Sequence, residues 1–423
     1  MITPTIMKTF LLVLIFLIGT SAFVVKKINT FDGTPELLEF DRDGNTYIVT
    51  NSTIHQLHKL NLAKELLWSL DLPYRAGKIM INSQNDVYIT FKPDWYIDNL
   101  YILREDSLTF EEIGGNDNGG YFIGVMDSDD YVFYNGREGM YMIRPNSTTP
   151  ELILNLENYR TYIERTFIYD NEGNVFFGVQ TYEGWNASLA VITKEAKQQT
   201  PPSAQLYILE QWSAINGFTV DQNNDLWIFS SLTLYYSYIK KYSKGELTNI
   251  LNDEVFDFHL GKAVKDRIYV FSMSSRLNKA PTYIITLDNE FVEIPDLDNV
   301  EFYKYWNMRM VADKDGYVYI SSNFLYDKGA ILLFKPDGTN ATGIEFGRVV
   351  YILNTILDNN DDLWVVTMGK GVYYLKKDEI IPVRVPNANG LEKDFEDIKL
   401  NSKTNEVFVI GDNALYVVVD DSN

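Results

Sequence analysis

The sequence predicts an all-β fold, a single β-propeller built from four-stranded antiparallel blades, and three observations favour this class. A segment in which an acidic turn precedes an aromatic strand recurs nine times along the 423 residues. The recurrences lie 41 to 51 residues apart, and a period of roughly 40–50 residues is typical of propeller blades. Aromatic residues make up 14% of the chain, led by 29 tyrosines and 24 phenylalanines, which favours half-buried strands over helices.

One repeat can be assigned completely, in Leu353–Lys376 and the residues that follow it. A first strand ends at the turn Asp358–Asp362, and a second strand carries Trp364. A glycine turn leads to a third strand, and the amphipathic run Ile380–Val385 is expected to be the fourth. Asp, Asn and Gly suit the tight turn, because Asp and Asn bond to their own backbone and Gly and Asn tolerate positive φ.

Each copy has one landmark aromatic in its second strand. The nine landmarks are Tyr47, Tyr88, Phe133, Phe176, Trp227, Tyr269, Tyr319, Trp364 and Phe408. Nine copies predict nine blades, and the two spacings of 51 and 50 residues leave room for eight blades with an irregular insertion.

The two ends of the chain each hold part of a blade. The last copy stops at Val419, after its third strand, whereas Phe23–Ile28 forms a strand that precedes the first copy. Pairing these two would cover an edge that is otherwise open to aggregation. We therefore expect the N-terminal strand to close the ring.

The N-terminus has the composition of an export signal. Lys8 precedes the apolar run Phe10–Ile18, and small residues follow up to Ala22. This order is that of a signal peptide over residues 1–22, and its apolar run is too short to span a bilayer. The propeller domain then covers residues 23–423, and the protein is expected to be secreted and extracellular, with no membrane association after cleavage.

Charge and modification signals agree with an extracellular protein. The net charge is −21, and without a basic footprint nucleic acid is not an expected partner. The chain has no cysteine, so burial alone must hold it together. Glycosylation sequons begin at Asn51, Asn146, Asn186 and Asn340.

Two turn-strand segments, DQNNDLWIFS (221–230) and DNNDDLWVVTMGKGVYYL (358–375), resemble the regulator-propeller repeats of bacterial two-component sensors. The likeness covers the repeat, since no kinase segment follows. As an exported single-chain propeller, the protein is also similar to insect haemolymph pigment carriers of the ommochrome-binding type. That resemblance implies a non-catalytic carrier of a small aromatic ligand.

The connections between second and third strands provide a candidate ligand site. Five of them are expected to be long: Lys92–Asn99, Thr181–Ser188, Ser231–Tyr236, Ser274–Pro281 and Asn323–Gly329. Four of the five carry aromatics, namely Trp95, Tyr96, Tyr182, Trp185, Tyr235, Tyr236, Phe324 and Tyr326. Aromatics clustered on one face can clamp a planar or apolar ligand. Alternatively, these rings fold back to cover blade edges.

First strands provide a second candidate set. Ten residues before a landmark stand Lys78, His259, Arg309 and Asn354, and one position earlier stand Glu36, Arg165, Asn216 and Asp397. The cations Lys78, Arg165, His259 and Arg309 could hold an anionic ligand. They could instead pair with Glu36, Glu396 and Asp397.

Catalytic and metal chemistry has weaker support. His55 and His58 lie three residues apart in a predicted strand, so they face opposite sides and cannot share a metal. No catalytic residue, metal or cofactor is therefore assigned, and the partner is expected to be a small molecule or a protein. Two alternatives remain: an extracellular protein-interaction factor of venom, saliva or haemolymph, and a calcium-dependent lactonase or esterase that would use Glu36, Asn216, Asn354 and Asp397.

Overall fold

The computed structural model places strands along nearly the whole chain. It describes residues 23–28, 31, 33–94, 97–115, 124–135, 138–155, 159–161, 167–181, 187–210, 213–232, 237–253, 257–273, 282–294, 309–321, 328–336, 341–348, 351–386, 395–411 and 414–420. These residues divide into two compact units. One comprises Glu36–Phe302 and Lys335–Ala341 and the other Met1–Pro35, Tyr303–Phe334 and Thr342–Asn423, and each is described by itself.

The first of these, here the six-blade unit, contains blades 1 to 6. Blade 1 consists of β2 (Thr34–Phe40), β3 (Thr46–Asn51), β4 (Gln56–Leu60) and β5 (Leu66–Asp71). Blade 2 consists of β6 (Arg75–Ile81), β7 (Val87–Asp94), β8 (Ile97–Leu103) and β9 (Phe110–Gly115). Blade 3 consists of β10 (Val125–Met126), β11 (Val132–Asn135), β12 (Gly139–Ile143) and β13 (Pro150–Asn155). Blade 4 consists of β14 (Tyr159–Thr161), β15 (Phe167–Tyr169), β16 (Val175–Thr181), β17 (Ala187–Ile192) and β18 (Gln205–Glu210). Blade 5 consists of β19 (Ser213–Val220), β20 (Leu226–Leu232), β21 (Ser237–Ser243) and β22 (Glu246–Asp253). Blade 6 consists of β23 (Asp257–Val264), β24 (Arg267–Met273), β25 (Thr282–Thr286) and β26 (Phe291–Ile294).

The second, the three-blade unit, contains blades 7 to 9. Blade 7 consists of β27 (Arg309–Ala312), β28 (Val318–Ser321), β29 (Lys328–Phe334) and β30 (Ala341–Arg348). Blade 8 consists of β31 (Tyr351–Leu357), β32 (Leu363–Met368), β33 (Gly371–Leu375) and β34 (Val383–Val385). Blade 9 consists of β35 (Phe395–Asn401), β36 (Glu406–Gly411), β37 (Ala414–Asp420) and β1 (Phe23–Ile28). The nine sheets confirm the prediction of a nine-bladed β-propeller.

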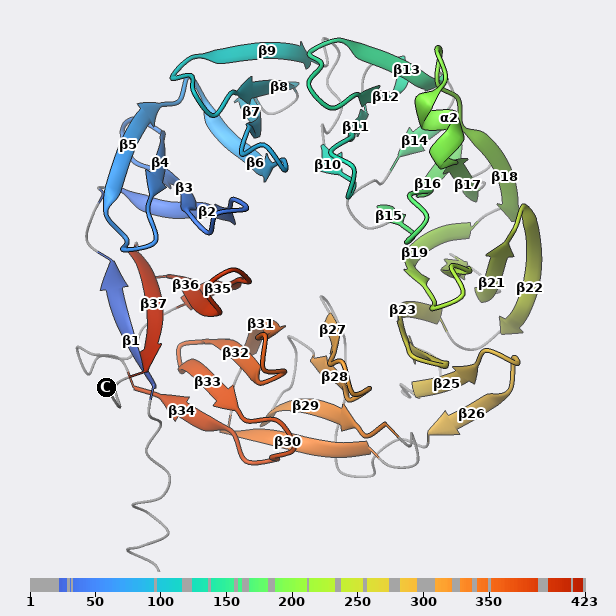
Figure 1. Ribbon diagram of the computed structural model, residues 1–423. Helices are drawn as coiled ribbons and strands as arrows, with labels where there is room; N and C mark the ends of the chain where they lie inside the picture. The colour runs from blue at the N-terminus through green and yellow to red at the C-terminus, as the bar shows by residue number, and fades with distance from the viewer. Residues whose placement is uncertain are drawn as a thin grey trace, which may run out of the picture. The chain divides into compact units, whose positions relative to one another are not determined.

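Successive strands of a blade pair with one another in antiparallel fashion. Within each unit the first strand of a blade lies innermost and the fourth lies at the outer edge (Figure 1). In blade 4 the first strand is in two pieces, β14 and β15, which both pair with β16. The described part of the chain has one short helix, α2 (Lys194–Gln198), between the third and fourth strands of that blade.

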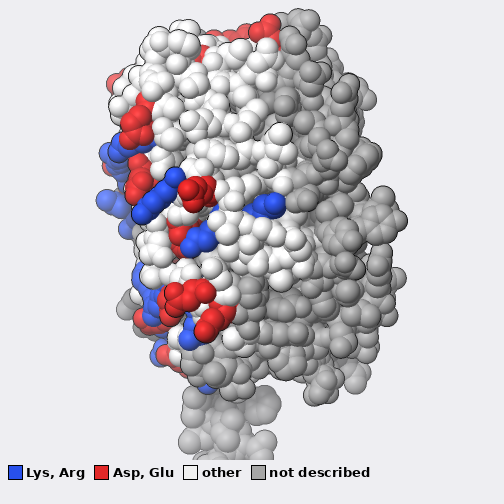
Figure 2. All heavy atoms as spheres, turned by 90° about the vertical axis from the view of Figure 1, so that its right-hand side faces the viewer, with Lys and Arg blue, Asp and Glu red and all other residues white. Residues whose placement is uncertain are grey.

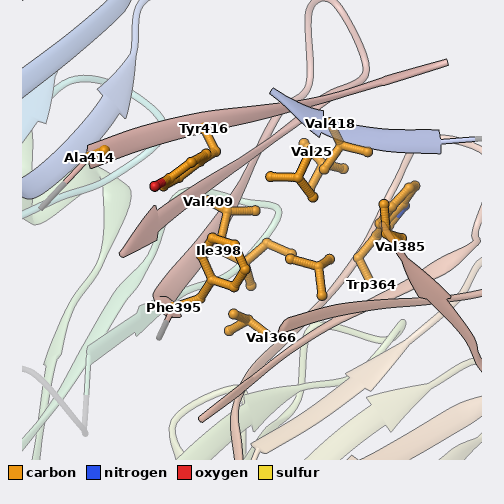
Figure 3. Packing of buried hydrophobic residues seen from close by; sticks show 12 residues of the cluster. Val25, Trp364, Val366, Val385, Phe395, Ile398, Val409, Ala414, Tyr416 and Val418 are labelled. Atoms are coloured by element: carbon orange, nitrogen blue, oxygen red, sulfur yellow. The ribbon is translucent and has the colours of Figure 1, made fainter. Parts of the chain in front are cut away.

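The N-terminal strand completes blade 9, as predicted. Strand β1 pairs antiparallel with β37, with Phe23 opposite Asp420 and Ile28 opposite Leu415. Val25 enters a cluster with Trp364 of blade 8 and Tyr416 of blade 9 (Figure 3). Residues from the two ends of the chain thus share one core.

Each core cluster is built from neighbouring blades. Tyr47 of blade 1 packs with Ile89 of blade 2, and Tyr319 of blade 7 packs with Val365 of blade 8. All nine landmark aromatics are at most 2% exposed. Fully burying one large apolar side chain contributes about 1.5–3 kcal/mol, so the repeated aromatic is a main source of stability between blades.

The acidic turns bury their first aspartate because its carboxylate is fully used. Asp358 Oδ1 accepts the backbone N–H groups of Asn360 (2.8 Å) and Asp362 (3.1 Å), and its Oδ2 accepts the indole N–H of Trp364 at 3.0 Å. Asp221 does the same with Trp227, at 2.8 Å. In these two blades the turn and the landmark tryptophan are therefore one hydrogen-bonded unit.

Two sequence expectations are corrected at blade edges. Lys92–Asn99 is not a long loop, since β7 runs to Asp94 and β8 begins at Ile97, with Asp94 paired to Ile97. The fourth strand of blade 8 is shorter than Ile380–Val385 and begins only at Val383. Ile380 and Ile381 precede it and are 51% and 73% exposed.

Candidate ligand-binding site

The eight aromatics of the predicted ligand site lie outside the described residues. They are Trp95, Tyr96, Tyr182, Trp185, Tyr235, Tyr236, Phe324 and Tyr326. Arg165 is also outside them, and of His259 only the backbone, in β23, is described. The site is therefore built from the first strands, which hold the other two predicted cations, Lys78 and Arg309.

Strand register defines which first-strand residues are equivalent. In each blade compared, one first-strand residue pairs with the second-strand residue that follows the landmark aromatic by two positions. The pairs are Lys78 with Thr90, Gly217 with Phe229, Leu260 with Phe271, Arg309 with Ser321, Asn354 with Val366 and Asp397 with Ile410.

This register corrects the sequence count at two residues. Asp397 joins Lys78, Arg309 and Asn354, although the count along the sequence places it one position earlier. His259 does not share that position, because it is the extra residue where the ladder shifts by one. Asn216 is the extra residue of its own strand and lies one position before Gly217, where the count along the sequence also places it. Such β-bulges re-aim a side chain, and a count along the sequence cannot detect them.

Three equivalent residues of the three-blade unit form a hydrogen-bonded chain across adjacent blades. Arg309 Nη1 on β27 donates to Asn354 Oδ1 on β31 at 2.7 Å. Asn354 Nδ2 donates to Asp397 Oδ1 on β35 at 2.5 Å and to the carbonyl oxygen of Ile398 at 3.3 Å. Asn354 is 7% exposed, whereas Arg309, the first residue of the chain, is exposed to solvent.

The six-blade unit contains a different arrangement of a first-strand arginine. Arg75 at the start of β6 donates to both carboxylate oxygens of Glu36, with Nη2 2.9 Å from Oε1 and Nε 3.2 Å from Oε2. Asn51 Nδ2 also donates to Glu36 Oε1, at 2.8 Å. The arginine charge is neutralised at this position, and the partner of Glu36 is Arg75 rather than one of the four cations predicted from the sequence.

The other polar residues considered in the sequence analysis are placed as follows. Asn216 Nδ2 donates to the carbonyl oxygen of Phe258 at 2.7 Å, and Lys78 is half-buried. His58 bonds to Thr50 and Ser69 through its two ring nitrogens, each at 2.8 Å. Within the described ranges no three His, Asp or Glu side chains are placed to share a metal ion.

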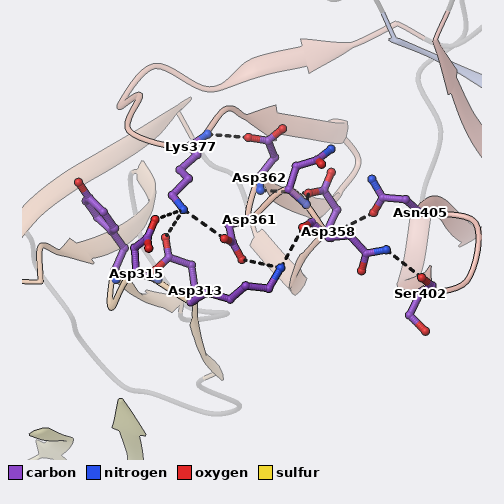
Figure 4. A network of polar contacts seen from close by, with 12 residues as sticks. Asp313, Asp315, Asp358, Asp361, Asp362, Lys377, Ser402 and Asn405 are labelled. Atoms are coloured by element: carbon purple, nitrogen blue, oxygen red, sulfur yellow. Dashed lines mark hydrogen bonds and ion pairs between the residues drawn. The ribbon is translucent and has the colours of Figure 1, made fainter. Parts of the chain in front are cut away.

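Lysines fill the carboxylate clusters on the turn side. Lys377, which follows the third strand of blade 8, bonds to Asp315 and to Asp361 (3.1 Å) and lies 3.8 Å from the buried Asp313 Oδ2 (Figure 4). The hydrogen bond with Asp315, together with the other carboxylates, raises the pKa of Lys377. An ammonium group thus occupies the position that a metal cation would need.

Lys197 of α2 has the same role four blades earlier in the chain. Its Nζ lies 2.6 Å from Asp127 and 3.3 Å from Asp129, the first and third residues of the turn in the preceding blade. Burial raises the pKa of Asp127, and the hydrogen bond and charge of Lys197 oppose that rise. The buried turn carboxylate is therefore paired with one specific lysine.

Charges on the described surface are mixed in sign. On the side of the six-blade unit that carries β18 and β22, positive and negative side chains alternate along one edge (Figure 2). Lys241 and Asp225 of blade 5 form a largely buried ion pair, 2.7 Å apart.

The two described sequons differ in the availability of their asparagine. Asn51 donates its amide to Glu36, as stated above. Asn146 is exposed in the turn between β12 and β13, with φ 63°. Asn186 and Asn340 lie outside the described residues.

Sequence reasoning missed Arg75, Lys197 and Lys377 as organising residues. Arg75 stands at the start of a first strand, as Arg309 does, and that shared position is a signal that could have identified it. The two lysines contact carboxylates 62 to 70 residues away in sequence, and no local pattern marks such contacts.

Comparisons with known proteins give structural likeness only. Neither a scan against protein-family models nor a search of curated proteins finds a match. Among solved structures, YCF48 bound to D1 peptide is 10% identical, with a TM-score of 0.47 over 95% of this chain and 97% of that one. The extracellular domain of the hybrid two-component system BT3049 from B. thetaiotaomicron is 11% identical, with a TM-score of 0.36 over 95% of this chain and 59% of that one. A prolyl endopeptidase structure is 12% identical, with a TM-score of 0.49 over 94% and 56%.

All three TM-scores are below 0.5, so function is argued from the residues of this chain. The described residues include no helix that is long and apolar enough to cross a membrane.

Proposed function

We propose that the protein is a secreted, non-catalytic propeller that binds a small aromatic or amphipathic molecule, as a pigment carrier does. The binding face is the one from which the connections between second and third strands leave. Export rests on the signal peptide expected over residues 1–22, and the fold supplies the rigid scaffold on which such connections bind ligands.

The supporting observation is an apolar pair at that face. Tyr351 begins β31 and Met368 ends β32, where the two residues lie opposite each other in register. They are 36% and 56% exposed. Adjacent exposed apolar side chains mark interaction surfaces more often than scattered ones do, and this pair lies at the end of blade 8 where its second and third strands are connected.

The test is a titration of the purified full chain with fluorescent aromatic probes, together with native mass spectrometry of protein from its source. We expect saturable tryptophan quenching and a co-purifying small molecule. Replacing Trp95→Ala together with Trp185→Ala should abolish the quenching, while Trp68→Phe on the fourth strand β5 should preserve it. A protein that shows no saturable signal with any probe would contradict the proposal.

The alternatives have distinct outcomes in the same preparation. A protein-interaction factor would retain a protein partner in the native mass measurement and would show no small-molecule signal. A calcium-dependent hydrolase would turn over aryl esters and lose that activity with a chelator.

A further inference from the structure

Arg309 is an exposed cation with a fixed orientation. It is the first residue of β27, opposite Ser321, and its Nη1 is tied to Asn354 Oδ1 at 2.7 Å. A guanidinium group has five N–H donors, so this single bond leaves donors that face solvent.

The side chain that holds Arg309 is itself immobilised. The oxygen of the Asn354 amide also accepts the N–H of Thr355 at 2.7 Å, while its nitrogen donates to Asp397 and to the Ile398 carbonyl. All four hydrogen-bonding positions of this amide are used. Asp397 is fixed in turn by the N–H of Ile398, at 2.8 Å.

The group that binds the Arg309 guanidinium is neutral, so this hydrogen bond does not balance its charge. Asn354 separates the guanidinium from Asp397, and within the described ranges no carboxylate forms an ion pair with Arg309. Arg75 differs, because both oxygens of Glu36 bind it. Planar guanidinium groups bind carboxylates and similar oxyanions through two parallel hydrogen bonds, so Arg309 is suited to an anion and Arg75 is already occupied by one.

Apolar surface lies along the same strand. Tyr351 precedes Asn354 by three residues on β31, which corresponds to about 7–10 Å along a strand. Tyr351 and its partner Met368 are the exposed pair described above. A molecule with a flat apolar body and an acidic group at one end could contact both parts of this surface.

We propose that Arg309 is the acid-binding subsite of the ligand site, and that the ligand is an aromatic or amphipathic organic acid. Asn354 and Asp397 are positioning residues that hold the guanidinium. This inference rests on the proposed binding function and specifies the class of ligand.

The test uses two dyes with the same ring system. 8-Anilinonaphthalene-1-sulfonate carries an anionic group, and N-phenyl-1-naphthylamine lacks it. Arg309→Met should lower the affinity for the sulfonate dye about tenfold or more, the size expected for the loss of charge-assisted hydrogen bonds. The affinity for the neutral dye should stay within about twofold of that of the unmodified protein. Raising the salt concentration from roughly 0.05 to 0.5 M should lower the affinity of the unmodified protein for the sulfonate dye, and it should lower that of the variant much less.

Matched variants separate this role from a general effect of charge or folding. Arg75→Met removes an exposed first-strand arginine that is already paired and should change neither affinity. Arg309→Lys should give intermediate affinity, because it keeps the charge but loses the planar fork. Asn354→Asp should place a carboxylate against Arg309 and lower the affinity for the sulfonate dye only, whereas a merely structural residue would lower both affinities.

The outcomes distinguish the two proposals. If neither dye binds the unmodified protein saturably, the binding function itself is contradicted. If both dyes bind and Arg309→Met changes neither affinity, or if Arg75→Met has the same effect as Arg309→Met, the acid subsite alone is overturned.

Discussion

The acidic turns and the first strands of the blades use charge in opposite ways. In the turns, carboxylates are buried and bonded to backbone N–H groups, an indole or a lysine, as Asp358, Asp221 and Asp127 show. On the first strands of the three-blade unit, Arg309 is exposed and held by a neutral amide. These turn carboxylates therefore serve folding, and a binding site is better sought where a charge has no ion-pair partner among the described residues.

The largest expected effect comes from breaking a turn at its aromatic. Trp364→Ala should lower the free energy of unfolding by about 3–5 kcal/mol, because it opens a cavity between blades 8 and 9. It also leaves Asp358 Oδ2 without its donor. Urea unfolding monitored by circular dichroism measures the loss.

Two further variants separate these contributions. Trp364→Phe keeps most of the packing and should cost about 1–3 kcal/mol for the unpaired carboxylate oxygen. Met368→Ala, at a half-exposed position on the same strand, should change stability little. Equal losses in Trp364→Phe and Met368→Ala would contradict the role of the indole hydrogen bond.

A buried turn carboxylate deprived of its lysine should make stability depend on pH. Lys197→Met should cost about 3 kcal/mol near neutral pH, since it leaves Asp127 charged and buried. Burial already raises the pKa of Asp127, and loss of the lysine raises it further. A carboxyl group whose pKa is raised on folding contributes most to the free energy of unfolding at a pH below its pKa in the unfolded state. This contribution is lost as the pH rises through its pKa in the folded state.

The loss caused by Lys197→Met should therefore be smaller near pH 4 than near pH 8, as measured by unfolding at both. Adding Asp127→Asn should remove this pH dependence. A loss that is the same at both pH values would show that Asp127 is not the group that titrates.

A smaller effect concerns the mass of the protein rather than its stability. It depends on whether the asparagine side chain of a sequon is exposed or hydrogen-bonded. Secretory expression should place a glycan on Asn146, whose amide is exposed, and not on Asn51, whose amide is bonded to Glu36. Asn146→Gln should reduce the intact mass by one glycan, while Asn51→Gln should leave glycosylation unchanged. Loss of a glycan in Asn51→Gln would mean that the bond to Glu36 does not persist.

The architecture could be predicted because its signal is local. Asp358, the turn and Trp364 lie within seven residues, so each blade carries its own signature, and the nine copies gave the blade number. The closing strand Phe23–Ile28 was also predictable, since an unpaired strand at one end matched a missing strand at the other.

The site was less predictable because its geometry depends on contacts between blades. The strand register places Leu260 rather than His259 level with Lys78 and Arg309 and adds Asp397 to that set, and spacing alone does not reveal such shifts. The polar run Lys92–Asp94 suggests a loop, yet backbone pairing extends β7 through it. The roles of Lys197, Lys377 and Asn354 arise from partners more than 40 residues away.

The central claim is that turn cations stabilise the fold while Arg309 binds a ligand. Its most direct test is the affinity for 8-anilinonaphthalene-1-sulfonate of two cation deletions, Arg309→Met and Lys377→Met, measured below their unfolding transitions. We predict that only Arg309→Met loses affinity, by about tenfold, while Lys377→Met binds the dye as the unmodified protein does. Equal affinities in the two variants, or a loss confined to Lys377→Met, would contradict the account.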